Sequence, residues 1–182
     1  MWTIETADNH FVTAVGGGGK STRAFHTDAT KPLAWEWFYL LKCGDLGDPG
    51  FQYAIRPAGT GNVPGGGERV AFLTAVGGGN RRHHALTVNG PFQFESRFNL
   101  IRQPDQSYAL RTSNGFTYVT DDDGGGLAHG TPQLDNLFTT QTQVQDWEKF
   151  KIVETSPGLY TIQTVSGQER LLEYLDANQL SG

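Results

Sequence analysis

Acidic residues and glycines stand together in the stretch "YVTDDDGGG" at residues 118–126. Calcium is bound by carboxylate oxygens, so three consecutive aspartates suggest a calcium site as one interpretation. An EF-hand loop alternates its aspartates with other residues and ends on a distal glutamate, and this stretch does neither. Aspartate and glycine also favour tight turns, because glycine readily adopts a positive φ. The stretch therefore favours a solvated hairpin turn, with a calcium site as the alternative.

Histidines are the other residues that could hold a metal ion: His10, His26, His83, His84 and His129. Neighbouring residues of a strand point to opposite faces, so His83 and His84 do not ligate one ion easily from a strand. The chain has no H-x-H or H-E-x-x-H spacing. We therefore predict no metal site and interpret "NRRHH" as a polar hairpin tip. Its Arg81 and Arg82 could attract an anionic ligand, with a solvated turn as the simpler interpretation.

Motifs for catalysis and for cofactor binding are also missing. The string "GGGGKST" resembles a phosphate-binding loop, but it leads into the strand-like "RAFHTDA" where such a loop requires a helix. No G-x-S-x-G nucleophile motif is present. Glu36, Glu95 and Glu148 recur at matching places along the chain, which predicts positions spread around a symmetric fold rather than two acids facing one cleft. We expect a protein without enzymatic activity or cofactor, whose repeated glutamates accept backbone hydrogen bonds.

Composition limits the classes of partner. The chain has 182 residues, a formal net charge of −5 and 24 glycines. An acidic protein is poorly suited to binding nucleic acid, which requires a basic surface. No apolar stretch approaches the length of a membrane span, and the first residues show no signal-peptide pattern. The single cysteine, Cys43, excludes an internal disulfide. One glycine-rich domain with many turns is expected, and the sequence assigns it no compartment.

Three strings recur in the same order along the chain. The first string is "WTIET" at Trp2, "YAIRP" at Tyr53 and "YALRT" at Tyr108, with a fourth copy, "YTIQT", at Tyr160. The second is "FVTAVGGGG", "FLTAVGGGN" and "YVTDDDGGG", and the third is "AWEWFYLL", "FESRFNLI" and "DWEKFKIV". The triple aspartate thus occupies a slot that glycine-rich turns fill in the other copies. The repeat predicts three structural units and explains the acidic stretch as one of their turns.

Apolar residues alternate within each string, which indicates half-buried strands. Three units too small to bury their own apolar faces predict a closed assembly without exposed sheet edges. We therefore predict an all-β fold, a β-trefoil of residues 1–154 with repeats at about 2–42, 51–102 and 107–154. Phe38, Phe98 and Phe150 should meet near its axis. An extra residue between Glu95 and Phe98 predicts a β-bulge.

Residues 155–182 form a C-terminal extension that begins as a partial fourth repeat. The string at Tyr160 predicts an extra strand, which could displace the first strand, pair beside it or begin a neighbouring domain. Only "QERLLEYLDANQL", residues 168–180, has helical composition, so a short helix is expected there.

The strings "TIETADNHFVTAVGGGG" and "HTDATKPLAWEWFYL" resemble fascin-like β-trefoil modules. The bacterial form, often attached to polysaccharide-degrading enzymes, is the most similar, and the resemblance covers about 150 residues with an interruption at "PAGTGNVPGGGER". It implies a non-catalytic carbohydrate-binding module that recognises a polysaccharide or glycan. The alternative is a protein-interaction trefoil of the actin-binding or protease-inhibitor type.

The candidate sugar platform is an aromatic pair in the third string of the first repeat. Trp37 and Tyr39 alternate with the inward-facing Phe38, where the other repeats place polar residues. Exposed aromatic rings can stack on sugars, and His26 with Asp28 could supply hydrogen bonds to hydroxyl groups. The alternative is that the C-terminal extension or a second subunit packs over this pair.

Overall fold

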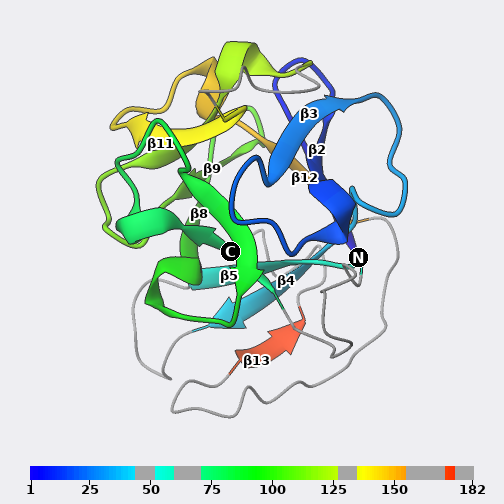
Figure 1. Cartoon of the computed structure of the whole chain (residues 1–182). Helices are drawn as coiled ribbons and strands as arrows, with labels where there is room; N and C mark the ends of the chain where they lie inside the picture. The colour runs from blue at the N-terminus through cyan, green and yellow to red at the C-terminus, as the bar shows by residue number, and fades with distance from the viewer. Residues whose placement is uncertain (44–51, 60–70, 127–134, 155–170, 175–182) are drawn as a thin grey trace.

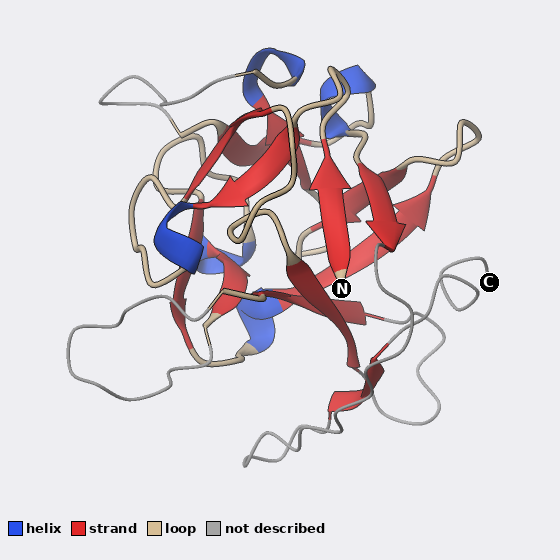
Figure 2. Cartoon of the chain, turned by 90° about the vertical axis from the view of Figure 1, so that its right-hand side faces the viewer, coloured by secondary structure: helices blue, strands red, loops and turns tan. Residues whose placement is uncertain are grey.

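The computed structural model describes residues 1–43, 52–59, 71–126 and 135–154, and the backbone of 171–174. Within them the regular structure consists of short antiparallel strands and single 3₁₀ turns, drawn as short coils in Figure 2. The strands are β1 (Trp2–Glu5), β2 (Phe11–Ala14), β3 (Phe25–Ala29), β4 (Phe38–Cys43), β5 (Gln52–Pro57), β6 (Phe72–Ala75), β7 (Leu86–Gly90), β8 (Arg97–Arg102), β9 (Tyr108–Arg111), β10 (Tyr118–Asp121), β11 (Leu137–Gln141), β12 (Lys151–Glu154) and β13 (Leu171–Tyr174). The 3₁₀ turns are η1 (Val15–Gly17), η2 (Val76–Gly78), η3 (Phe94–Ser96), η4 (Asp122–Gly124) and η5 (Asp146–Glu148).

Six strands close into a barrel. Strand β1 pairs with β4, β4 with β5, β5 with β8 and β8 with β9, all antiparallel. The ring closes because β12 pairs with β1 and reaches β9 through the bridge between Tyr108 and Phe150. Strands β1 and β4, β5 and β8, and β9 and β12 are the first and last strands of successive repeats (Figure 1). Closure pairs the barrel edges that each repeat would expose alone.

Each repeat contributes its two middle strands as a hairpin: β2–β3, β6–β7 and β10–β11. Apolar side chains from all three hairpins join the barrel interior in one core cluster. Phe38, Phe98 and Phe150 belong to the same cluster and are almost completely buried. A six-stranded barrel with three hairpins in pseudo-threefold order is a β-trefoil. The predicted fold is therefore confirmed, with the three phenylalanines in its common core.

The C-terminal extension contains a strand where a helix was expected. Strand β13 lies inside the segment 168–180 and pairs with β4, with Leu171 opposite Cys43 and Tyr174 opposite Leu41 (Figure 1). The prediction of a helix is wrong at these residues, because β4 extends beyond its single pair with β1 and offers unpaired backbone groups to a further strand. The string at Tyr160 lies outside the described residues.

The turn before the last strand of each repeat corrects one alignment made from the sequence. Glu36, Ser96 and Glu148 each lie two residues before the buried phenylalanine of the closing strand, and all three are buried. Ser96 therefore takes the place that was assigned to Glu95. No bulge is needed between Glu95 and Phe98, because 3₁₀ turn η3 ends at Ser96 and β8 begins at the next residue.

Candidate functional site

His26 and Asp28 lie on β3 at alternate positions, so both side chains project from the same face of the hairpin. The imidazole Nδ1 and the carboxylate Oδ1 are 2.7 Å apart, which fixes the two side chains relative to one another. Both remain partly accessible. The structure thus brings these two sequence-predicted residues together as one hydrogen-bonded pair.

Trp37, immediately before β4, and Tyr39, within it, are both half-buried. The carbonyl of Trp37 accepts a hydrogen bond from the Ala58 N–H at 2.7 Å. The guanidinium of Arg56, the cross-strand neighbour of Tyr39, lies 4.6 Å from the centre of the Tyr39 ring. The aromatic pair therefore belongs to the barrel wall, whereas His26 and Asp28 belong to a hairpin.

Two other tryptophans, Trp35 and Trp147, are exposed at the surface. Their exposed fractions are 46% and 45%. Each precedes a buried glutamate, Glu36 or Glu148, in the turn before the closing strand of its repeat. The signal was present in the strings "AWEW" and "DWEK", in which a tryptophan recurs one residue before the glutamate.

Buried carboxylates hold these two turns in place. Glu36 Oε2 accepts a hydrogen bond from the Leu33 N–H at 2.7 Å, and its Oε1 accepts one from the Thr13 hydroxyl at 2.7 Å. Glu148 Oε2 accepts a hydrogen bond from the Gln145 N–H at 2.8 Å. The expectation that repeated glutamates accept backbone hydrogen bonds is confirmed for these two residues.

The second repeat builds the same turn without a tryptophan. Ser96 Oγ accepts the Gln93 N–H at 3.3 Å and lies 2.9 Å from the Thr74 hydroxyl, so a serine replaces the carboxylate. The position of Trp35 and Trp147 is occupied by Glu95. The two exposed tryptophans thus break the threefold symmetry as a pair.

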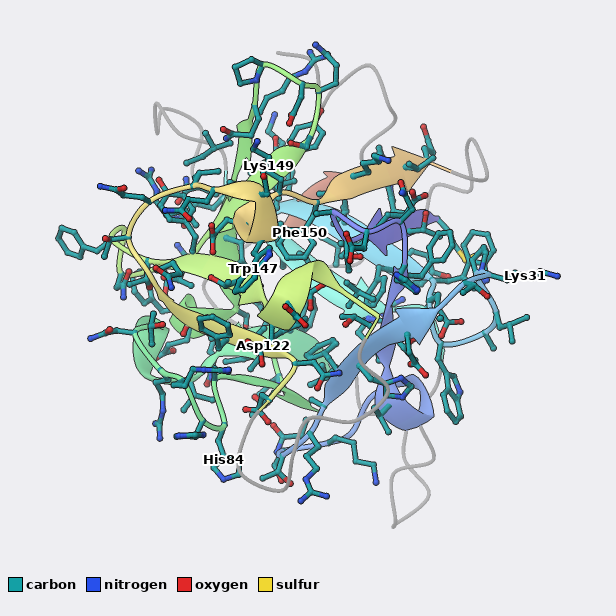
Figure 3. All side chains as sticks on the ribbon, turned by 90° about the horizontal axis from the view of Figure 1, so that it is seen from above. Lys31, His84, Asp122, Trp147, Lys149 and Phe150 are labelled. Atoms are coloured by element: carbon teal, nitrogen blue, oxygen red, sulfur yellow. The ribbon has the colours of Figure 1, made fainter. Side chains whose placement is uncertain are left out.

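The hairpin turn of each repeat packs against the next repeat, and we call these three contacts the junctions. At the third–first junction, Gly124 lies against Trp147 and Asp8. A Cβ on Gly124 would lie 3.2 Å from Cδ1 and 3.3 Å from Nε1 of the indole, and 3.8 Å from Cγ of Asp8. The Asp8 N–H also donates to the Gly124 carbonyl at 3.1 Å. Figure 3 shows Trp147 between Asp122 of this turn and Lys149.

Asp121 lies beneath this junction and is only 1% exposed. The first and second repeats have Ala14 and Ala75 at its position. Its Oδ1 accepts a hydrogen bond from the Thr27 hydroxyl at 3.2 Å, while its buried Oδ2 has no hydrogen-bond partner among the described residues. The pKa of Asp121 is raised to about 8, chiefly by burial and also by the nearby charges of Asp122 and Asp8, while the hydrogen bond from Thr27 lowers it.

The expectation of a solvated turn is therefore wrong for Asp121, the first of the three aspartates. Asp122 is also engaged, because its Oδ2 lies 2.9 Å from the Arg82 guanidinium, which in turn lies over the Phe138 ring at 4.0 Å. Arg82 is thus a packed residue of the third repeat's border. Of the three aspartates only Asp123 is exposed, and it has a left-handed conformation with φ of 62°.

No group of three histidine, cysteine, aspartate or glutamate side chains among the described residues could hold a metal ion. None of the helical turns in the described ranges has the length or apolar character of a membrane span.

Comparisons with known proteins support the fold and leave the function open. No protein-family model and no curated protein matches the sequence. Among solved structures, the chain is similar to ThreeFoil, a designed protein with threefold symmetry, at a TM-score of 0.62 and 10% sequence identity. The match covers 85% of this chain and 98% of that chain. At this identity the similarity shows the β-trefoil architecture, and a fold of this kind hosts many functions.

Proposed function

We propose that this protein is a non-catalytic module that binds carbohydrate through Trp35 and Trp147. The observation that carries the proposal is the pair of half-exposed indoles at equivalent positions of two repeats. Tryptophan is enriched at binding interfaces, and indole rings stack well on the apolar faces of sugar rings.

The turns that carry the tryptophans support this proposal because they are already ordered. Glu36 and Glu148 fix them through buried hydrogen bonds, and the Trp35 carbonyl accepts the Ala14 N–H at 3.0 Å. A preformed platform loses little conformational entropy on binding, which matters for weak, stacking-based recognition. Two such platforms on one domain would increase the avidity for a polymer with repeated sugars.

The residues that were predicted from the sequence extend the platform formed by Trp35. Trp37 lies two residues after Trp35, and its half-buried ring together with Tyr39 could widen the contact with a sugar chain. His26 and Asp28 form a polar pair that could bind hydroxyl groups.

The test is a glycan array followed by titration calorimetry on variants. Trp35→Ala and Trp147→Ala should each weaken binding of the selected glycan about tenfold or more. Phe116→Ala is the matched control, because Phe116 is 76% exposed on a different turn and should leave affinity unchanged. A glycan that binds equally well to all three variants would contradict the proposed platforms.

A protein partner is the second candidate, and one observation favours it. Leu33, which is 71% exposed, lies in the same turn as Trp35, so the loop presents two large apolar side chains. Apolar residues of this kind form the centre of protein interfaces. A protein-interaction trefoil of the actin-binding or protease-inhibitor type would be revealed by co-sedimentation with filaments or by protease inhibition that Leu33→Ala abolishes.

A further inference from the structure

The two tryptophan platforms differ in chemistry, and we propose that the Trp147 platform binds an amino sugar, with the ammonium group held between the Trp147 indole and the Asp8 carboxylate. The inference rests on the proposed function and adds the ligand class for one of its two platforms.

The geometry of the third–first junction places an aromatic ring and a carboxylate around the same point. The Trp147 indole and the Asp8 carboxyl carbon both lie within 4 Å of the position that a Cβ on Gly124 would take. Gly124 is buried, and a Cβ at that position would be only 3.2 Å from the indole, so the turn packs closely against the ring. Trp147 and Asp8 are both exposed, so a ligand would lie on the solvent side of the turn, over the two side chains. An exposed indole beside a carboxylate is a favourable setting for an ammonium group, because the negative charge attracts it and the accessible face of the ring can stack on it.

The charges around this point favour a cationic ligand. Asp8 is exposed, and within the described part of the chain no side chain forms an ion pair or hydrogen bond with its carboxylate. The neighbouring cations already have partners. Lys149 Nζ lies 3.0 Å from Asp146 and 3.4 Å from Asp105, and Lys151 Nζ donates to Asn9 Oδ1 at 2.6 Å. The carboxylate of Asp8 is therefore the available charge beside the indole.

The other two junctions lack this combination. Gly17, Gly78 and Gly124 end the equivalent 3₁₀ turns of the three repeats. Gly59 lies against Gly17, where its Cβ would be 3.2 Å from the Gly17 Cα, and the Asn114 N–H donates to the Gly78 carbonyl at 3.3 Å. Gly59 and Asn114 thus take the place of Asp8.

The first–second junction consequently pairs Trp35 with a glycine, and the second–third junction pairs Glu95 with an asparagine. Only the third–first junction, among the described residues, combines a tryptophan with a carboxylate. The Trp35 platform, which has the apolar Leu33 beside it, is suited to a neutral sugar instead.

The experiment compares a glucosamine hexamer with an N-acetylglucosamine hexamer by titration calorimetry at pH 5.5, where the free amines are protonated. The unmodified protein should bind the glucosamine hexamer at least tenfold more tightly. Asp8→Asn should abolish this preference while leaving the affinity for the N-acetylated hexamer unchanged. Asparagine is tolerated at this position, since Asn114 occupies the equivalent place in the second–third junction.

Glu95→Gln is the matched control, because it removes the same charge at the position equivalent to Trp147 in another repeat and should keep the preference. Equal binding of the two hexamers, or an Asp8→Asn variant that retains the preference, would overturn the inference and leave the proposed function standing. Failure to bind either hexamer would overturn the inference, and failure on the whole glycan array would overturn the proposed function as well.

Discussion

The first–second and third–first junctions share one backbone geometry but differ in chemistry. Gly18 and Gly125 follow the equivalent 3₁₀ turns with φ of 113° and 124°. A Cβ on Gly18 would contact the apolar side chains of Val88 and Pro57, whereas one on Gly125 would contact the Thr6 hydroxyl and the buried carboxylate of Asp121. The threefold backbone arrangement thus determines where the repeats contact one another, while the residue types at each junction differ.

The barrel interior and the junctions differ in how strongly the fold restricts their residue types. The barrel interior has phenylalanine at the equivalent positions 38, 98 and 150, because each must fill the same space. The junctions lie at the edge of that core, where polar groups are tolerated if they find hydrogen bonds. Asp121 and the pairing of Trp147 with Asp8 are both departures of this kind, and both lie at the junction that joins the last repeat to the first.

The largest effect should come from the shared core. Phe38→Ala, Phe98→Ala and Phe150→Ala should each lower the free energy of unfolding by about 3–5 kcal/mol, because a phenylalanine truncated in a packed core leaves a cavity. Urea denaturation of the three variants provides the comparison. A cost below about 1 kcal/mol for one of them would show that the repeats do not share one core.

The next effect concerns the carboxylate of the third–first junction. The pKa of Asp121 is about 8 when folded, against 3.8 for the unperturbed group, so the folded protein retains a proton that the unfolded chain releases. The stability contributed by this proton is present at about pH 4 and is lost progressively as the pH rises to about 8. Between pH 5 and 7, the free energy of unfolding should fall by about 2–3 kcal/mol relative to Asp121→Asn, whose side chain does not titrate.

Denaturant titrations of the parent protein and Asp121→Asn at several pH values measure this difference. Parallel curves for the two proteins would mean that Asp121 is ionised in the folded state. The account of the junction as a site of buried, protonated acid would then be wrong.

A smaller effect should distinguish the junctions through their glycines. Gly18→Ala and Gly125→Ala introduce a Cβ at similar positive φ values, so backbone strain is nearly the same in both. Gly125→Ala should cost about 1 kcal/mol more, since its methyl group displaces Thr6 and Asp121, which are held by hydrogen bonds. Thermal unfolding of the two variants measures the difference, and equal melting temperatures would argue against a distinct third–first junction.

The fold could be predicted from the sequence because the buried positions repeat. Phe38, Phe98 and Phe150 fill one core and therefore recur with the strands that carry them. The same reasoning misplaced Glu95, because matching by residue type overlooked that the Ser96 hydroxyl can replace a carboxylate in the turn. It also expected a helix where β13 forms, since local composition says nothing about an open strand edge elsewhere in the fold.

The candidate site was less predictable. Alternation along the closing strand identified Trp37 and Tyr39 as outward-facing, but the 3₁₀ turns that expose Trp147 and bury Glu148 do not follow a strand pattern. The contact between Asp8 and Gly124 joins residues of the first and third repeats, which are far apart in the sequence. It therefore depends on closure of the barrel. The sequence predicts a solvated turn at Asp121, because burial against another repeat produces no pattern in the neighbouring residues of the sequence.

The most direct test of the proposed platforms is to follow the four tryptophan indole N–H signals by NMR while adding the oligosaccharide that the glycan array selects. We predict that the signals of Trp35 and Trp147 shift on binding, while that of Trp2, only 3% exposed, does not. A shift confined to Trp37 would place the sugar on the barrel wall instead. Unchanged signals from Trp35 and Trp147 at saturation would contradict the account.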